Sequence, residues 1–389
     1  GGGFWRVLRR ECGRIVSTPY YLLFVFIFPI VVLGILAVSL SSSVPRKMPI
    51  VVCDGDSSDL SRRLMRMFSA SPTLDVVDAA DSMKEAEAVM RLGGAYAIVY
   101  IPPQFKRDVH RGVAPGIELY GNTQWLLTSG VIAKALREVT TALSLDVDTQ
   151  VRMAQGEAMG AARAHAEPIL MEQHVLFNPC LSYKDFLIPP LFIGVLQIFV
   201  IVVMVSAIGL ELKHGTAGEW LDAAGGRSVW ALLGKMAPYT ALFLLLTAFI
   251  MVWIYKYQGV PFQGNAWLTA WGAALFVLAY QAMGFAFIVL TSNYRLAGSL
   301  AGFYAGPAFA FSGFTFPSIG MPLAAKAWAA ILPLNYFGHF LLNQASRGAS
   351  LESARFDIFV LTGFAVIPIV LLFPRFRRLL RDPKCWGHI

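Results

Sequence analysis

The segment Glu211-Leu212-Lys213-His214-Gly215-Thr216-Ala217-Gly218-Glu219-Trp220-Leu221 is the stretch from which the architecture of this chain can be worked out. It is short and charged, and it lies between two long apolar runs, residues 186–210 and 229–255. A segment of this length cannot fold alone, and it contains no catalytic constellation. It therefore predicts a short polar helix at a membrane surface, held between two membrane-spanning helices.

The composition also indicates a membrane protein. Hydrophobic residues make up 56% of the 389 residues and charged residues 14%, whereas soluble domains carry about 25% charged residues. The mean hydropathy is +0.59. The apolar residues form blocks of the length that crosses a bilayer, about 20 residues, and no block has an acid in its middle, where a charge costs about 2.5–3.5 kcal/mol. Within segments 20–43 and 185–374 we therefore predict six transmembrane helices, at residues 20–40, 186–210, 229–255, 267–290, 296–316 and 356–373.

Lys and Arg residues set the predicted orientation, because short cytoplasmic loops are rich in them. Residues 1–19, the connector 211–228, Arg295 and the basic tail 375–389 place most basic residues on one side. Both termini are therefore expected in the cytoplasm. The net charge of +8 is then mainly a topology signal, and a nucleic-acid surface is not expected, because the basic residues follow the span ends and do not form one face.

Residues 1–19 alternate apolar and basic side chains at helical spacing. Phe4, Val7, Leu8 and Ile15 could face lipid while the arginines face head groups, which predicts an amphipathic elbow helix on the inner leaflet. A plain basic patch that fixes the topology is the alternative, and both can hold.

Residues 44–184 form the large polar region of the sequence, which alternates strand and helix patterns. We expect an inserted α/β domain outside the cytoplasm, with both of its ends entering the bilayer. Strands are expected at 50–53, 74–77, 95–101 and 117–120, helices at 58–69, 83–92, 103–110 and 123–166, and an extended piece at 169–177.

Two short features of this insert have alternative interpretations. Asp54-Gly55-Asp56 resembles the start of a phosphoryl-transfer site, but no partner motif follows it, so a turn whose Asp56 or Ser57 caps the next helix is preferred. Cys53 and Cys180 lie near the two ends of the insert. They either form a disulfide in an oxidising compartment or remain unpaired core residues.

The sequence lacks the motifs of several chemistries. It has no Gly-x-x-x-x-Gly-Lys-Ser/Thr phosphate loop, since Gly234-Lys235 is followed by Met236. The six histidines show no metal-ligand spacing, and the intramembrane carboxylates that ion-driven carriers usually need are missing. We therefore expect no catalytic residue, metal or cofactor in this chain and an energy source outside it.

The predicted fifth span carries Gly298, Gly302 and Gly306, which fall on one helix face. Close packing inside one subunit and a subunit interface or gate both fit this pattern. After it, residues 317–345 contain two helices too short and broken to span, which we expect as a re-entrant pair in the outer leaflet.

An apolar substrate path along these spans is a further hypothesis, with ordinary packing between helices as the alternative. Its candidate residues are Gln197, Phe199, Phe303, Pro307 and Phe311.

Motifs after the fifth span and in the connector resemble those of the ABC type 2 transporter permeases. Ser312-Gly313-Phe314-x-Phe316-Pro317, followed by Met321-Pro322 and Leu332-Pro333-Leu334-x-Tyr336, looks like the C-terminal signature of that family. Glu211-x-x-x-Gly215-Thr216-x-x-x-Trp220-Leu221 with Gly234-Lys235 resembles its first cytoplasmic loop.

The resemblance covers nearly the whole chain. The insert, with its strand Ala95–Ile101 and Pro102-Pro103, looks like the external domain of a bacterial multidrug-type subfamily. The turn Ala223-Ala224-Gly225-Gly226 departs from the Thr/Pro-rich turn that is usual after the loop helix, which affects the expected fit to an ATPase.

The resemblance implies the permease subunit of an ATP-binding-cassette exporter in the bacterial inner membrane, with the six-span ABC type 2 exporter fold. Its implied partners are two cytoplasmic ATPase subunits that bind ATP and magnesium, a second copy or close paralogue, the lipid bilayer and a periplasmic adaptor. The apolar spans favour a hydrophobic or amphipathic cargo such as a drug, lipid or lipid-linked molecule.

The resemblance also implies that the connector is the coupling helix that an ATPase moves, with a plain solvated connector as the alternative. Gly215 and Thr216 belong to the matching motif. Glu211, Lys213 and Glu219 would offer charges to the ATPase surface, and Trp220 and Leu221 would offer hydrophobic anchors.

Two other functions remain open at this point. An ATPase-driven mechanotransmitter would use the spans to signal to a periplasmic cell-wall enzyme without moving cargo, and such proteins usually have four spans. An ion-driven carrier is the third possibility.

Overall fold

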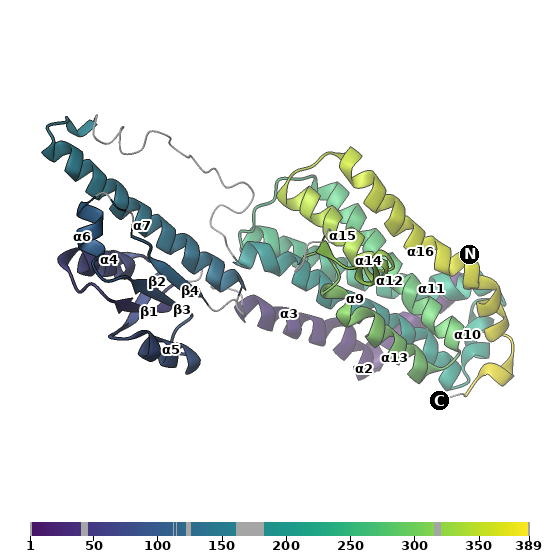
Figure 1. Cartoon of the computed structure of the whole chain (residues 1–389). Coiled ribbons are helices and arrows are strands. Elements are labelled where there is room, and N and C mark those ends of the chain that lie inside the picture. Colours follow the sequence, from purple (N-terminus) through teal and green to yellow (C-terminus); the bar gives the residue numbers. More distant parts are fainter. Residues whose placement is uncertain are drawn as a thin grey trace. The chain divides into compact units, whose positions relative to one another are not determined.

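The computed structural model describes residues 2–39, 46–111, 113, 115–121, 126–160, 183–314 and 320–387. The chain divides into two compact units (Figure 1). Unit 1 comprises Gly1–Ser43 and Leu176–Ile389, and unit 2 comprises Val44–Val175.

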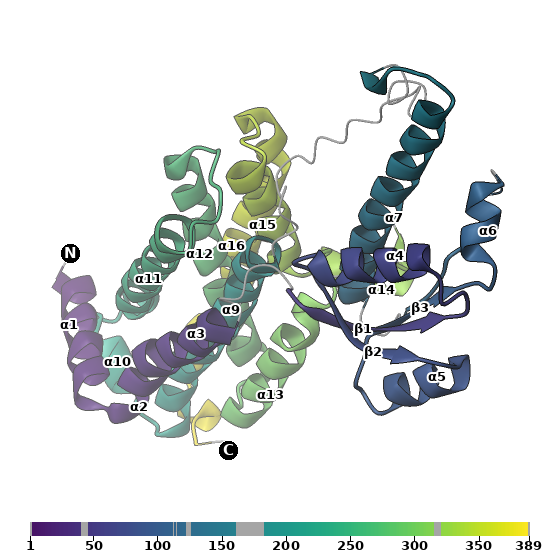
Figure 2. The same ribbon diagram turned by 90° about the vertical axis from the view of Figure 1, so that its left-hand side faces the viewer.

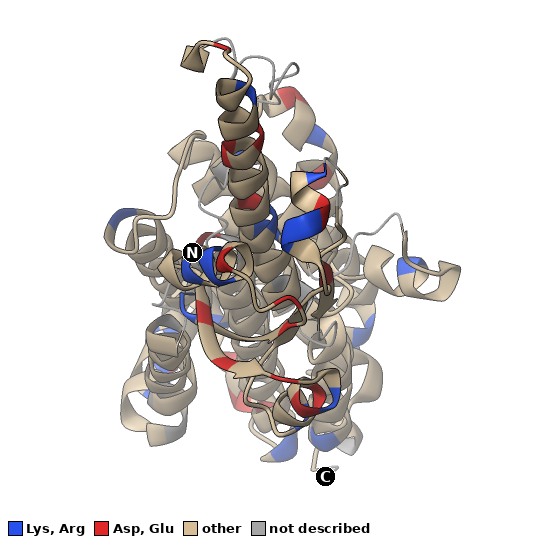
Figure 3. Cartoon of the chain, turned by 60° about the vertical axis from the view of Figure 1, so that its left-hand side comes forward, with Lys and Arg blue, Asp and Glu red and all other residues tan. Residues whose placement is uncertain are grey.

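Unit 1 is a bundle of apolar helices. Four of the described helical segments are long and apolar enough to cross a bilayer. Three of them are α9 (Tyr183–Lys213), α12 (Ala266–Thr291) and α16 (Leu351–Leu379), and the fourth joins α11 (Ser228–Val252) to the π-helix η3 (Trp253–Tyr257). Helix α12 packs against α9 and α16 and buries Phe276, Tyr280 and Phe285. The charged residues of α9 and α16 lie near the helix ends, α12 has none, and most of the ribbon in Figure 3 is accordingly neither blue nor red.

The prediction of six full-length spans is not confirmed. The first apolar block forms α2 (Pro19–Leu22), the π-helix η1 (Leu23–Ile27) and α3 (Phe28–Ser39), of which residues 23–36 make a shorter apolar helix. The predicted fifth span at 296–316 is wrong as one continuous helix. Helix α13 (Tyr294–Ala305) ends before Pro307, and the 3-10 turn η4 (Pro307–Phe309) follows.

The break has a physical cause. Pro307 lacks a backbone N–H and its ring clashes with the preceding turn, so it ends the helix. The 12 residues of α13 are about 18 Å long, short of a hydrocarbon core of about 30 Å.

Two short helices follow within the stretch predicted to hold a re-entrant pair. They are α14 (Leu323–Ala330) and α15 (Pro333–Leu341), and the π-helix η6 (Leu342–Ser346) continues α15. Pro333 starts α15 in the first turn, where the missing N–H needs no partner. The Tyr304 hydroxyl donates to the carbonyl of Ile331, 2.5 Å away, and so ties α13 to the turn between the two helices. Their depth in a membrane stays a prediction.

Helix α1 (Gly2–Ser17) does not present its apolar face to lipid as predicted. Val7, Glu11 and Ile15 form one buried stripe, and the helix packs along α11. A Cβ at Gly234 would lie 2.8 Å from the Cβ of Val7. Glycine at this position of α11 therefore permits the close approach of α1.

Unit 2 is built on a four-stranded mixed sheet. Its strands are β1 (Met48–Asp54), β2 (Leu74–Ala80), β3 (Ala97–Ile101) and β4 (Glu118–Gly121), in the order β2-β1-β3-β4. Strand β1 pairs in parallel with β2 and β3, and β4 runs antiparallel to β3. Each strand matches one of the predicted strand patterns.

Helices cover both faces of this sheet. Helices α4 (Asp59–Ala70) and α7 (Leu126–Ala154) lie over one face and α5 (Met83–Arg91) lies against the other (Figure 2). The side chains alternate accordingly: Ile50 and Val52 pack toward α4 and α7, and Val51 packs toward α5.

Unit 2 also contains the short helix α6 (Phe105–His110). The prediction of one helix over 123–166 is wrong, because α7 ends at Ala154, ahead of Gly156 with φ +96°. The extended piece expected at 169–177 falls outside the described residues.

The turn after β1 leads into a capped helix, but the cap of α4 is Ser58 and not Asp56 or Ser57 as predicted. The Asp54 carboxylate accepts hydrogen bonds from the backbone N–H groups of Asp56 and Ser57, both at 3.0 Å, and from the Ser61 hydroxyl at 2.7 Å. Ser58 caps α4 by accepting from the N–H of Ser61. The Asp54 carboxylate thus accepts three hydrogen bonds that hold the turn in its conformation.

Cys53 is a buried thiol on β1. Burial and then the nearby Asp54 raise the pKa of the Cys53 thiol, which disfavours the reactive thiolate. Its predicted partner, Cys180, lies outside the described residues, so the disulfide stays a prediction.

Candidate functional site

The connector between α9 and α11 folds as a turn, a short helix and a second turn. Helix α10 (Ala217–Ala223) is its helical part. Gly215 enters the first turn with φ +70°, and Gly225 and Gly226 form the second with φ +69° and +73°. These are left-handed conformations that glycine adopts without strain. The two turns therefore place α10 between the end of α9 and the start of α11.

Glu211 lies at the end of α9 and is fully buried. Its Oε1 accepts from Arg10 Nη1 at 2.8 Å, from Arg14 Nη1 at 2.7 Å and from Lys235 Nζ at 3.0 Å. Its Oε2 accepts from Arg10 Nη2 at 3.2 Å and from the Thr216 hydroxyl. One carboxylate thus joins α1, α9, α11 and the first turn of the connector.

A second buried carboxylate completes the arrangement. Glu11 Oε1 accepts from Lys235 Nζ at 2.5 Å, and its Oε2 accepts from the Tyr239 hydroxyl at 3.3 Å. Lys235 and both acids are fully buried, while Arg10 and Arg14 keep 29% and 22% of their side chains exposed. We call Arg10, Glu11, Arg14, Glu211 and Lys235 the ion cluster.

The physics of burial makes the members of this cluster interdependent. Taking charges out of water is costly, and the cost is recovered only when every group has close partners of opposite charge and hydrogen bonds. Three basic side chains surround two acids here, and each buried acid has at least two donors. Moving α9 away from α1 would separate these charges, so the cluster acts as a brace between the connector and α1.

Trp220 is the hydrophobic part of the same site. It is fully buried, and its indole N–H donates to the carbonyl of Ala231 at 3.1 Å. Lys235 Nζ lies 4.5 Å from the centre of its ring, a cation–π contact. On another side its ring centre is 5.7 Å from that of Phe376 in α16. Figure 2 shows α10 beside α1, where these contacts gather.

The structure therefore corrects part of the predicted coupling surface. The side chains of Glu211 and Trp220 point into the chain and cannot reach a partner protein as they stand. Lys213 is half-buried, with its Nζ 5.7 Å from the centre of the Tyr294 ring. Leu221 is partly buried against the core.

Other connector residues do face outward. Gly215 and Glu219, both among the predicted residues, are exposed. His214, Asp222 and Arg227 are exposed as well and were not singled out from the sequence. The outward face of the connector is thus polar and carries two acids on α10.

Sequence reasoning missed most of the ion cluster. The arginines of α1 were interpreted as a topology signal, and Lys235 only as part of a Gly-Lys motif. Two signals were available: Glu11 is an acid in an otherwise basic helix, and Lys235 is a cation inside an apolar run. Each one calls for a buried partner of opposite charge.

The glycines of α13 do not pack within this subunit. No atom outside the local helix lies within 4 Å of a Cβ placed at Gly298 or Gly302, and the position at Gly306 meets only the carbonyl of Gly302. The buried face of α13 carries Ala297 and Ala301 in their place. Within the part of the chain that the structure describes, the face that carries Gly298 and Gly302 is open, so packing inside one subunit is not seen for it.

The five residues of the hypothetical substrate path do not share one environment. Gln197 is fully buried, and its Nε2 donates to the carbonyl of Ala305 at 3.2 Å, near the end of the broken helix α13. Phe303 is 67% exposed and Pro307 is exposed too, whereas Phe199 and Phe311 are partly buried against the core. Gln197 thus bonds a neighbouring helix, and the path stays a prediction.

A bundle of apolar helices with a short polar connector braced on a buried ion cluster defines a polytopic membrane permease. The chain belongs to the ABC-2 family: a model described as "ABC-2 family transporter protein" matches residues 19–373. Permeases of this kind work with ATP-binding partner subunits.

The chain is similar over most of its length to three named proteins of Escherichia coli K12. It is 24% identical to the probable multidrug ABC transporter permease YbhS over 342 residues, 86% of each chain. It is 25% identical to the inner membrane transport permease YhhJ over 347 residues, 85% of this chain and 86% of that one. It is 21% identical to the probable multidrug ABC transporter permease YbhR over 351 residues, 90% of this chain and 91% of that one.

Proposed function

We propose that the chain is the permease subunit of an exporter that moves a hydrophobic or amphipathic molecule out of the cytoplasm or the inner leaflet. Two separate ATPase subunits would supply the energy. The observation that carries this proposal is the ion cluster, because Glu211 fixes the connector to α11 through the fully buried Lys235 and to α1 through the partly buried Arg10 and Arg14. A connector held in this way can pass a push to several apolar helices at once.

The coupling step follows from the outward face of the connector. Closure of the ATPase pair would press on α10 through the exposed Glu219 and Asp222. The end of α9 would then move together with α1 and α11, since Glu211 is bonded to both. Packed helices switch between discrete arrangements and do not bend continuously. The basic residues near the connector support a cytoplasmic location for it and for both termini.

The coupling role predicts a result for the exposed acids. The double variant Glu219→Lys and Asp222→Lys should reduce the stimulation of ATPase activity by the permease about fivefold or more, because it reverses the charge that a partner meets. ATP hydrolysis would be measured on the reconstituted complex. The thermal melt of the permease alone should stay unchanged, since both side chains are exposed.

Glu138→Lys is the matched control, because Glu138 is an exposed acid on α7 of unit 2. It should leave the ATPase stimulation at the wild-type level. Full stimulation with the connector charges reversed would exclude α10 as the docking helix.

A second copy or a close paralogue is proposed to cover the open face of α13. Gly302→Leu should then weaken the dimer about tenfold or more, since the added side chain would hold the helices apart. Native mass spectrometry of the detergent-solubilised protein measures the dimer fraction.

Ser299→Leu places the same leucine side chain at another exposed position of α13 and should have a smaller effect. An unchanged dimer fraction with Gly302→Leu would place the interface elsewhere.

The mechanotransmitter is the second candidate, because only four of the described helical segments meet the length and hydropathy of a span. Transport is preferred because of the short pair α14 and α15, which a purely mechanical device does not need. Liposomes that hold the permease and its ATPase subunits separate the two. Movement of a labelled amphiphile across the bilayer with ATP supports export, and ATP hydrolysis without such movement supports the mechanotransmitter. An ATP-independent flux driven by an ion gradient would contradict both.

A further inference from the structure

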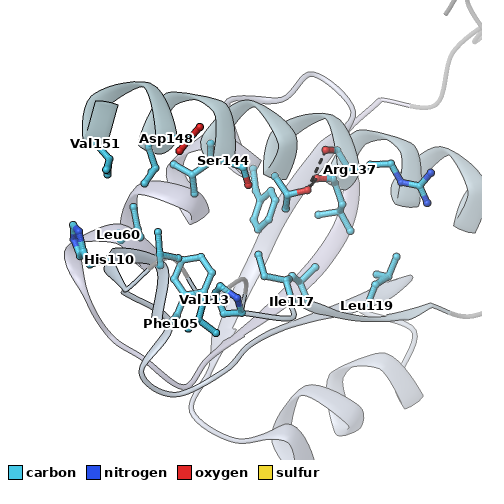
Figure 4. Close-up of a pocket in the computed structure, with 18 of the residues that line it drawn as sticks. Leu60, Phe105, His110, Val113, Ile117, Leu119, Arg137, Ser144, Asp148 and Val151 are labelled. Atoms are coloured by element: carbon cyan, nitrogen blue, oxygen red, sulfur yellow. Dashed lines mark hydrogen bonds between the residues drawn. The ribbon is translucent and has the colours of Figure 1, made fainter. Parts of the chain in front are cut away.

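Unit 2 contains a groove of about 660 Å³ that the proposed function does not use (Figure 4). One wall is α7, and the other is formed by α6 and the segment that leads into β4. Pockets for small molecules usually measure about 300–1,000 Å³ and have apolar walls with a few polar groups. The groove falls inside this range.

The floor and walls of the groove are apolar. Buried side chains from four elements form its floor, and half-buried or exposed ones form its sides. The floor residues are Phe68, Val99, Phe105, Leu136 and Leu143, and Val113, Ile117, Leu119, Val147 and Val151 lie along the sides.

Val113 is 56% exposed and Leu119 39% exposed. Apolar surface in contact with water is unfavourable, so an occupant with an apolar body would be stabilised here.

The charges around the groove favour an anion. Arg137 and His110 line it and are exposed, and neither has an ion-pair or hydrogen-bond partner for its side chain among the described residues. Asp148 also lines the groove, but Arg152 Nε lies 3.0 Å from its carboxylate and neutralises it. Figure 4 shows Arg137 near Leu119 and His110 toward Val151, at opposite ends.

We propose that this groove binds a single-chain amphiphile with an anionic head group. The alkyl chain of the amphiphile would lie between α7 and the segment that leads into β4. Its head group would lie at Arg137, whose guanidinium donates charge-assisted hydrogen bonds to carboxylate or phosphate oxygens. Arg137 is preferred over His110 because its planar guanidinium can donate two parallel hydrogen bonds to such a head group. The binding step needs no ATPase, so it can be tested apart from transport.

The probe is dansyl-labelled undecanoic acid, with its methyl ester as the uncharged counterpart. Each is titrated into the purified full-length chain in nanodiscs of zwitterionic lipid, and the signal of empty nanodiscs is subtracted. The wild-type chain should show saturable fluorescence enhancement and bind the acid more tightly than the ester.

Two variants test the two halves of the proposal. Arg137→Gln should weaken binding of the acid about tenfold, the effect of one charge-assisted hydrogen bond, and leave the ester unchanged. Val147→Trp should weaken both probes about tenfold or more by filling the groove. Arg66→Gln is the control, because Arg66 is an exposed arginine of α4 that does not line the groove. This variant should bind the acid and the ester with wild-type affinity.

Circular dichroism melts establish that each variant is folded. An absence of saturable signal above empty nanodiscs would overturn the proposal. Equal affinity for acid and ester, or an Arg137→Gln variant that binds the acid like the wild type, would overturn the anionic head group. Normal binding by Val147→Trp would place the bound probe outside the groove.

Discussion

Glu211→Ala is expected to destabilise the folded permease by about 3–5 kcal/mol, the usual cost of removing one partner from a buried ion pair. The change leaves Arg10, Arg14 and Lys235 facing one another with only Glu11 to balance them. The melting temperature of the purified chain in detergent should fall clearly. The ATPase activity stimulated by the permease should be lost as well, because the end of α9 is no longer fixed to α1.

Glu138→Ala is the stability control, since its side chain is 67% exposed and should change the free energy of unfolding by less than about 0.5 kcal/mol. A second comparison separates charge from packing. Glu211→Gln keeps the size of the side chain but removes its charge, and should lie between the wild type and Glu211→Ala. A wild-type melt for Glu211→Ala would mean that the cluster does not hold the connector.

Trp220→Ala is expected to cost about 3–5 kcal/mol, as for other large buried aromatic residues. The variant removes the ring that packs on Phe376 and the face that Lys235 contacts. Helix α10 would then lose its main anchor while its exposed acids remain in place. We expect a lower melting temperature and a loss of stimulated ATP hydrolysis in the same variant.

Trp220→Phe retains a smaller ring for Phe376 and Lys235 and loses the hydrogen bond to the carbonyl of Ala231. It should cost about 1 kcal/mol for that bond, apart from the smaller ring. Trp267→Ala is the matched control for loss of an indole, because Trp267 is 87% exposed. If Trp220→Ala melted like Trp267→Ala, the buried position of the indole would be wrong.

Local pattern was sufficient to predict much of the fold. The alternating residues of β1 place Ile50 and Val52 on one face and Val51 on the other, as period-two alternation requires. The continuous apolar run of α12 predicted its span to within one residue at either end. Both elements could be predicted because their patterns are set by residues close together in the sequence.

Helix α13 shows where local pattern is insufficient. The predicted fifth span runs through Pro307, and α11 does accommodate Pro238 in its interior. Yet α13 ends just before Pro307, and Gln197 of α9 takes up the carbonyl of Ala305 near the break. Whether a proline breaks a transmembrane helix depends on which groups nearby can satisfy the freed carbonyls. That information lies in the packing of distant segments.

The sequence signals at Glu11 and Lys235 call for buried partners, but which residues those partners are could not be predicted, for a similar reason. Arg10 and Glu211 are 201 positions apart, and Glu11 and Lys235 are 224 apart. Nothing in either local sequence specifies the other. Burial then reversed the expected orientation of Glu211, because a carboxylate with three basic partners is better placed inside than at the surface.

The separation of Glu11 and Lys235 along the chain has a consequence for biogenesis. The ribosome makes α1 first, but the lysine that pairs with Glu11 emerges 224 residues later. At about 5–20 residues per second, the N-terminal helix waits roughly ten seconds or more for that lysine. During translation α1 must therefore remain undocked until α11 is made. In a polypeptide truncated before α11, helix α1 would have no helix to pack against.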